Sequence, residues 1–211
     1  KTFVVETTLH SEHFNHSQFV ALKTKDAIVD QFRDKTGKRP NIDKDFPDLR
    51  IHIHIDRDMV TVSLDTSGES LHKRGYKTAT NIAPINEVLA AGILMLSGWR
   101  GQCDFLDPMC GSGTFLTEAA MIACNIPANL NRDEFGFETW PDFDEDLYEI
   151  IESASLKKIK DFHFKIVGYD IDPISIKKAK ENVKNANLQD FIEIKEQNFF
   201  ESKKEHDKYL H

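Results

Sequence analysis

The chain has 211 residues, of which 40% are hydrophobic, and a formal net charge of −8. This length and composition suffice for one large or two small soluble domains with an ordinary core. No apolar run approaches the roughly 20 residues that a membrane helix needs, and no signal peptide opens the chain, so we expect a cytoplasmic protein. Its three cysteines form no C-x-x-C pair, which argues against a disulfide framework and a structural zinc site.

The charge is unevenly distributed along the chain. Residues 1–77 carry 13 Lys and Arg against 12 Asp and Glu, whereas the remainder carries 14 against 23. A domain that binds nucleic acid normally presents a basic face, so charge alone argues against such a partner. Only a specific motif outweighs that objection.

Residues 1–70 predict a small α+β module. The strand-like stretch TFVVETTL precedes a helical pattern with Ser17 as its expected N-cap and Gly37 as its end. The stretch RIHIHIDRDMVTVSLD then alternates strictly between apolar and polar residues, which predicts a hairpin. The histidines at positions 10, 13 and 16 are interpreted as surface imidazoles, so no metal is expected.

Residues 71–83 predict a polar connection to a second domain over 84–211. The connection contains Lys73, Arg74 and Lys77, which are candidates for contacts to RNA phosphates, with solvated linker charges as the alternative. An apolar helix, INEVLAAGILMLSGW, follows and is expected to be buried. Short apolar strands then alternate with helices, which predicts a Rossmann-like α/β domain with a parallel sheet.

A glycine-rich turn in the second domain is the strongest functional signal. The run DPMCGSGTF places Gly111 and Gly113 between a strand and a helix, where open α/β sheets bind ligands. A Walker loop requires a lysine after the second glycine, and a dinucleotide site requires a third glycine where Leu116 stands. S-adenosyl-L-methionine is the candidate ligand that remains, because its amino-acid end needs an approachable backbone and an acidic partner for its ammonium. Glycines that serve only packing are the alternative.

Polar residues at the ends of the next two strands support this interpretation. Asp170 ends the strand of VGYDIDP, where a carboxylate can accept both ribose hydroxyls of a nucleoside. Asp172 is expected to cap the helix that starts at Pro173. Asn198 stands after the third strand, where its amide can read an adenine edge, with a plain surface turn as the alternative.

The blocks LHKRGYK, DPMCGSGTFLTEAAMIA and IVGYDIDP closely resemble the THUMP-domain class I RNA methyltransferases, specifically the large-subunit rRNA guanine-N2 methyltransferases. The resemblance covers nearly the whole chain. It implies that residues 1–70 are the C-terminal part of an RNA-binding THUMP module and that 84–211 begin a methyltransferase domain. It further assigns S-adenosyl-L-methionine to these residues: Asp107, Gly111, Ser112 and Gly113 at the methionine end, Asp170 at the ribose, and Asn198, where the family often has Asp, at the adenine.

An insertion at residues 125–158 separates the glycine turn from the acid-tipped strand. Its aromatic residues are expected to pack with an extra helix on the sheet edge, and a lid that stacks on a flipped base is the alternative. They are Phe135, Phe137, Trp140 and Phe143.

The catalytic motif that the family carries after its fourth strand, Asn-Pro-Pro-Tyr, is not found in this sequence. The chain contains no Pro-Pro pair and stops at KEHDKYLH, which looks like the approach to that strand. We therefore expect a fragment that retains part of the cofactor pocket and lacks the catalytic loop. The motif is expected beyond His211, so no residue of this chain is predicted to be catalytic. A tRNA guanine-N2 enzyme, a DNA adenine-N6 enzyme and a non-catalytic RNA-binding scaffold remain as alternative functions.

Overall fold

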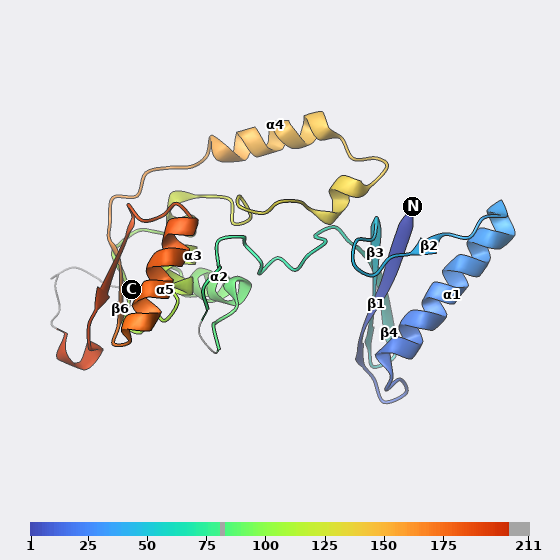
Figure 1. The fold of residues 1–211 in the computed structure, drawn as a ribbon, viewed down its shortest axis with the longest axis horizontal. Coiled ribbons are helices and arrows are strands. Elements are labelled where there is room, and N and C mark those ends of the chain that lie inside the picture. Colours follow the sequence, from blue (N-terminus) through green and yellow to red (C-terminus); the bar gives the residue numbers. More distant parts are fainter. Residues whose placement is uncertain (81–82, 203–211) are drawn as a thin grey trace. The chain divides into compact units, whose positions relative to one another are not determined.

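The protein is described here by a computed structural model that covers residues 1–80 and 83–202 (Figure 1). The chain divides into two compact units. The first contains residues 1–69 and 134–145, and the second contains residues 70–133 and the chain from 146 onward. Each unit has its own sheet. The expected division near residue 70 does not include the return of 134–145 to the first unit.

The first unit is a four-stranded sheet with the strand order β2-β1-β3-β4. Its parts are β1 (Thr2–His10), α1 (Ser17–Thr36), β2 (Asn41–Ile42), β3 (Leu49–Asp56) and β4 (Met59–Asp65). Strands β1 and β3 are parallel and are joined through α1, while β3 and β4 form the expected antiparallel hairpin. Ile53 and Ile55 are buried, and the rings of His52 and His54 stack 6.4 Å apart on the opposite face.

The ends of α1 agree only in part with the sequence. Gly37 ends the helix in the left-handed conformation with φ 70°, as expected. The expected N-cap Ser17 is wrong, because His16 takes that position and its Nδ1 accepts a hydrogen bond of 3.1 Å from the Phe19 amide. An imidazole nitrogen thus replaces the usual hydroxyl or carboxylate of a cap.

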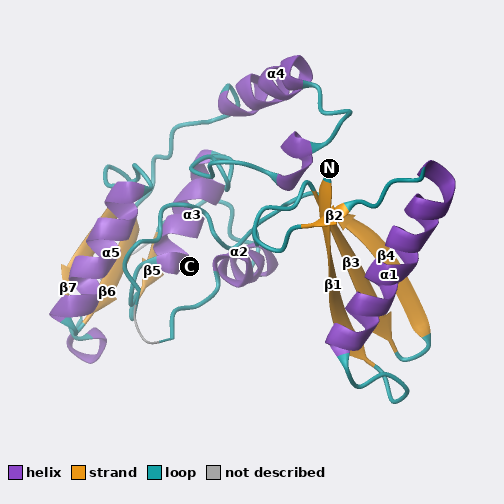
Figure 2. Cartoon of the chain, turned by 45° about the vertical axis from the view of Figure 1, so that its right-hand side comes forward, coloured by secondary structure: helices purple, strands orange, loops and turns teal. Residues whose placement is uncertain are grey.

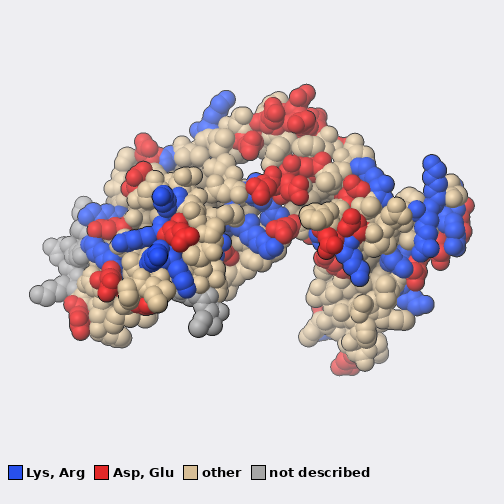
Figure 3. All heavy atoms as spheres, in the orientation of Figure 1, with Lys and Arg blue, Asp and Glu red and all other residues tan. Residues whose placement is uncertain are grey.

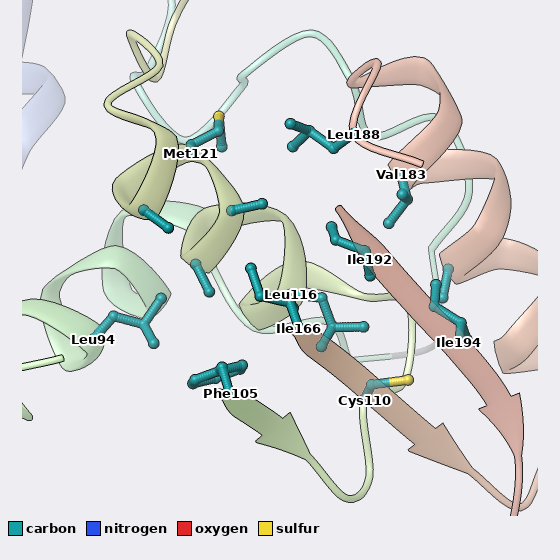
Figure 4. Packing of buried hydrophobic residues seen from close by; sticks show 14 of the residues in the cluster. Leu94, Phe105, Cys110, Leu116, Met121, Ile166, Val183, Leu188, Ile192 and Ile194 are labelled. Carbon is teal, nitrogen blue, oxygen red and sulfur yellow. The ribbon is translucent and has the colours of Figure 1, made fainter. Parts of the chain in front are cut away.

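The second unit has a parallel sheet with the order β5-β6-β7, as the alternation of strands and helices predicts (Figure 2). The strands are β5 (Phe105–Asp107), β6 (Ile166–Asp170) and β7 (Ile192–Glu196), connected through α3 (Thr114–Cys124) and α5 (Pro173–Asn185). Figure 4 shows Leu116 of α3 beside Ile166 of β6 in the middle of the core. Burial of these apolar side chains fixes the carboxyl ends of β5 and β6 beside each other.

Helix α2 (Glu87–Leu96) is less buried than its sequence predicts. Its buried residues, Glu87, Ala90 and Leu94, lie along the side that packs on α3. The other large apolar side chains of the helix are exposed: Val88, Leu89, Ile93, Met95 and Leu96. The expectation of a buried helix is therefore only partly correct, since the described residues cover one face of it.

The aromatic part of the insertion belongs to the first unit. In the short helix η1 (Gly136–Thr139), the Phe137 amide donates to the Thr66 carbonyl at 3.1 Å and the Thr139 hydroxyl to the Asp48 carbonyl at 2.8 Å. The Phe137 ring lies 5.4 Å from that of Phe135. The expected extra helix exists as α4 (Glu145–Leu156), but the expectation that the aromatic residues pack on the sheet of the second unit is wrong. A lid that stacks on a base stays a prediction.

Within residues 1–80 and 83–202, no helix is long and apolar enough to cross a bilayer.

Candidate cofactor site

The turn between β5 and α3 is held in a left-handed conformation by backbone hydrogen bonds. Gly111 has φ 54° and Gly113 has φ 81°, values that favour glycine. The Cys110 amide donates to the Tyr169 carbonyl of β6, and the Gly113 amide donates to the Cys110 carbonyl, both at 2.8 Å. The turn is thereby attached to the end of the neighbouring strand.

Gly113 is required for packing as well as for its conformation. A Cβ at this position would lie 3.2 Å from the Cβ of Ala179 in α5, so the glycine allows α3 and α5 to approach each other. The absence of a Cβ at Gly113 therefore opens space toward a helix. Contact of the cofactor with the backbone of Gly113 stays a prediction.

Asp170 joins the end of β6 to the glycine turn. Its Oδ2 accepts a hydrogen bond of 2.8 Å from the Gly111 amide, and its Oδ1 accepts one of 2.9 Å from the Asp172 amide. A carboxylate has about four acceptor positions, so it retains capacity for the hydroxyl groups of a ribose. The position is compatible with both a structural and a ligand-binding function.

Asp107 is a second acidic group at the same edge of the sheet. Its Oδ1 accepts a hydrogen bond of 3.2 Å from the Met109 amide. Burial raises the pKa of Asp107 above its ordinary value, and the negative charge of Asp170 raises that pKa further. Among the described residues, no Lys or Arg forms an ion pair with either carboxylate.

This donor and acceptor set fits the cofactor of the methyltransferases. S-adenosyl-L-methionine carries an ammonium and a sulfonium, and two carboxylates without basic partners among residues 1–80 and 83–202 favour a cationic ligand. The buried Ser112 and the backbone of the glycine turn follow Asp107 closely in the chain. The negative charges of Asp107 and Asp170 repel each other in the absence of a ligand, and the same charges would stabilise a bound cationic cofactor.

The remaining residues at the carboxyl edge act as caps. Asp172 caps α5 as expected, since its carboxylate accepts hydrogen bonds from the amides of Ile174 and Ser175. The hydroxyl of Ser175 and these amides lower the pKa of Asp172. Asn198 caps the short helix η2 (Phe199–Glu201) by accepting from the Phe200 amide at 3.1 Å, and contact with an adenine stays a prediction.

The three basic residues of the connecting segment have different surroundings. Arg74 is buried and pairs with Glu118 of α3 at 3.3 Å, and Lys77 pairs with Glu87 of α2 at 3.0 Å. The expectation that these two side chains are accessible to RNA phosphates is therefore wrong, and they are not solvated linker charges either. Lys73 is exposed.

Exposed basic side chains of the second unit lie on α5. Lys177, Lys180 and Lys184 are exposed, and Figure 3 shows Lys and Arg side chains over this helix. Their spacing of three and four residues places them along one side of α5.

Several polar residues of this unit have functions that the sequence does not reveal. Glu118 and Asn182 are almost completely buried polar residues on helices α3 and α5. Tyr76 donates from its hydroxyl to Glu118 at 3.2 Å, so the connecting segment shares a polar network with α3. The signal in the sequence is a polar residue on an otherwise apolar helix face, which does not identify its partners.

The last residues of the chain lie outside the part that the structure describes. Residues 203–211 include the whole segment KEHDKYLH, which ends at His211 and is expected to lead into the fourth strand. The candidate site consists of the residues that would hold the cofactor.

The parallel sheet, the glycine turn after β5 and the acidic end of β6 together define a class I methyltransferase domain. Residues 74–209 match the family described as RMKL-like, methyltransferase domain, and residues 1–65 match the THUMP domain. The chain therefore belongs to the RMKL-like methyltransferase family and carries a THUMP domain at its N-terminal side. The family match confirms the predicted fold class and S-adenosyl-L-methionine as the cofactor.

Individual relatives agree with this assignment. The chain is 42% identical over 206 residues to the ribosomal RNA large subunit methyltransferase K/L of Desulfotalea psychrophila, covering 92% of this chain and 28% of that protein. The solved structure of SMU.472 complexed with SAH has a TM-score of 0.83 at 32% identity and covers 97% of this chain and 54% of that one.

A second solved structure is that of a predicted N6-adenine-specific DNA methylase from Listeria monocytogenes. It has a TM-score of 0.84 at 32% identity and covers 99% of this chain and 55% of that one. The chain thus spans about half the length of these solved chains and 28% of the length of the Desulfotalea psychrophila protein.

Proposed function

We propose that this chain forms the cofactor-binding part and part of the RNA-binding module of an S-adenosyl-L-methionine-dependent RNA methyltransferase. Its proposed target is the exocyclic N2 of guanine in large-subunit ribosomal RNA, and its proposed location is the cytoplasm. The observation that carries the proposal is the pair Asp107 and Asp170, which lies at the glycine turn and forms no ion pair to Lys or Arg in the described chain. The THUMP match and the name of the Desulfotalea psychrophila relative favour ribosomal RNA.

The residues of the chain would bind and orient the cofactor. Asp107 would accept hydrogen bonds from the ammonium, Asp170 would accept from the ribose hydroxyls, and Asn198 would contact the adenine. Gly111, Ser112 and Gly113 would supply the backbone around the methionine end. When bound, the cofactor supplies an electrophilic methyl group to a nucleophilic base nitrogen. The contribution of this chain is positional, because fixing that methyl group against a base lowers the entropic cost of reaction.

The catalytic groups that act on the guanine are proposed to lie beyond His211, in a motif of the Asn-Pro-Pro-Tyr type. His211 itself and the segment before it belong to the residues that the structure does not describe, so this assignment rests on the sequence resemblance. The proposal therefore assigns cofactor binding to this chain and leaves hydrogen-bond acceptance from the amine to the longer protein.

Methyl transfer to ribosomal RNA tests the proposal. The chain and a version extended through the expected motif would be incubated with unmodified large-subunit rRNA and labelled cofactor, and the nucleosides identified by mass spectrometry. We expect N2-methylguanosine from the extended protein alone. Methylated adenine from DNA, or methylation of tRNA alone, would overturn the substrate, and RNA binding without cofactor binding would favour a scaffold.

A further inference from the structure

We infer that Asn182 is a positioning residue for the glycine turn of the cofactor site. Asn182 lies on α5 and its side chain has no exposed surface. Its amide nitrogen donates a hydrogen bond of 3.0 Å to the Ser112 carbonyl, inside the glycine turn. The inference rests on the proposed function, since it concerns the same cofactor pocket.

The same amide group also holds the segment that precedes α2. Oδ1 of Asn182 accepts hydrogen bonds from the amides of Thr78 and Ala79 at 3.2 and 3.1 Å, and Nδ2 donates to the Ala79 carbonyl at 2.7 Å. Together with the bond to Ser112, these contacts fill the two donor and two acceptor positions of a primary amide. One buried side chain therefore joins the connecting segment, α5 and the glycine turn.

Neighbouring side chains of α5 also bind the connecting segment. Glu181 accepts from the Thr78 hydroxyl at 3.2 Å, and Lys178 donates to the Thr80 carbonyl at 2.8 Å. Asn185 donates to the Tyr76 carbonyl at 3.2 Å and to Thr78 Oγ1 at 2.8 Å. The bond of Asn182 to the Ser112 carbonyl is what distinguishes it from Asn185, which otherwise holds the same segment with the same chemical group.

The orientation of the Ser112 peptide matters for a ligand at this edge. A peptide plane that places its carbonyl toward α5 places the following amide, that of Gly113, on its opposite side, and that amide closes the turn through Cys110. Removal of the Asn182 donor leaves the Ser112 carbonyl buried without this partner, which favours rotation of the peptide. The turn backbone would then no longer fit the methionine end of the cofactor.

The test compares two ligands that share the nucleoside. S-adenosylhomocysteine has the amino-acid end, whereas 5′-methylthioadenosine lacks it, and both would be titrated calorimetrically into the full chain. Asn182→Ala removes all four hydrogen bonds of the side chain, and only the bond to Ser112 reaches the glycine turn. We expect its loss to weaken S-adenosylhomocysteine binding about tenfold and to change methylthioadenosine binding less than about twofold. Asn182→Asp keeps the acceptor for Thr78 and Ala79 but loses the donated bonds to Ser112 and Ala79, so it should show the same selective loss together with lower stability.

Asn185→Ala is the matched control, because it removes an amide that binds the connecting segment and should leave both affinities unchanged. Equal loss of both ligands in the Asn182 variants, or equal behaviour of Asn182→Ala and Asn185→Ala, would overturn the inference. Unfolding of both Asn182 variants would also overturn it, because Asn182 would then support the whole fold and not the glycine turn specifically. If the unaltered chain binds neither ligand, the proposed cofactor function fails before Asn182 is at issue.

Discussion

Two sets of acidic residues in the second unit, one buried and one half-buried, differ in whether a basic side chain pairs with them. Glu118 and Glu87 lie against basic side chains of the connecting segment, at 3.3 Å from Arg74 and 3.0 Å from Lys77. Asp107 and Asp170 form no ion pair to Lys or Arg within the described chain. The difference separates two functions, because acids that stabilise the fold are neutralised internally, whereas acids that await a cationic ligand are not.

The same contacts connect the two blocks LHKRGYK and DPMCGSGTFLTEA. Arg74 and Tyr76 of the first block bind Glu118 of the second, so loss of either partner leaves a buried polar group unsatisfied. Burial nevertheless raises the pKa of Glu118 above its ordinary value, although Arg74 and Tyr76 act in the opposite direction. The connecting segment is therefore part of the methyltransferase core.

The largest effect on stability is expected when a buried acid loses the basic side chain that pairs with it. Arg74→Ala should lower the free energy of unfolding by about 3–5 kcal/mol, because Glu118 remains buried as an uncompensated charge. Urea unfolding followed by circular dichroism measures this. The double variant Arg74→Met with Glu118→Gln should recover most of the loss, since the amide still accepts from Tyr76. A loss below about 1 kcal/mol for Arg74→Ala would remove the distinction between the two sets of acids.

The second ion pair should behave in the same way with a smaller effect. Lys77→Met keeps the length of the side chain and removes its charge beside Glu87, so we expect a loss of about 3 kcal/mol, the lower end of the range for a broken buried pair. Lys157→Met, at an exposed position, should change the unfolding free energy by less than about 0.5 kcal/mol and serves as the control. Equal effects of the two substitutions would show that Lys77 is not part of the core.

Removal of an acid that has no ion pair to Lys or Arg should stabilise the fold. Because the pKa of Asp107 is raised in the folded state, that state binds a proton more readily than the unfolded chain. Stability therefore falls as the pH rises from the ordinary value of 3.8 through the raised pKa. Asp107→Asn should raise the free energy of unfolding at pH 7, because it removes a half-buried charge, and should weaken cofactor binding.

Thermal unfolding between pH 4 and 8 would measure the effect at Asp107, with the exposed Asp190→Asn as control. The gain for Asp107→Asn should shrink toward acidic pH. A variant that is less stable than the original at neutral pH would contradict the account.

The smallest effect is expected at the exposed basic residue of the connecting segment. Lys73→Gln should leave stability unchanged within about 0.5 kcal/mol. If Lys73 contacts one phosphate, the salt dependence of RNA binding should fall by about 0.7–0.9 in the slope of log affinity against log salt concentration. Fluorescence anisotropy with labelled RNA at several salt concentrations measures the slope. An unchanged slope would show that Lys73 contacts no RNA phosphate. The basic residues of this segment would then act only within the protein.

Elements that depend on local patterns could be predicted from the sequence, whereas contacts between distant residues could not. Strict alternation located the β3–β4 hairpin, and the glycine turn and Asp172 cap were identified because their signals lie within a few residues. Glu118 lies 44 residues from Arg74. The sequence therefore shows a positive charge in the connecting segment but does not show which acid pairs with it.

The same reasoning accounts for the insertion. Its aromatic residues indicate burial but not the surface that covers them, and Phe137 binds the backbone of Thr66 in the first unit. The close approach of Gly136 and Gly68, where a Cβ on Gly136 would lie 2.7 Å from the Gly68 nitrogen, is likewise invisible in the sequence. Asn182 could not be identified because a buried amide carries no local pattern.

Calorimetric titration of S-adenosylhomocysteine into the chain tests most directly whether the unbalanced acids form the cofactor site. Asp170→Ala and Asp107→Asn would be measured beside Glu193→Gln, an exposed control on β7. The account predicts binding by the unaltered chain and the control, with affinity reduced at least about tenfold in both aspartate variants. Equal binding by all four proteins would contradict it, as would the absence of binding to the unaltered chain.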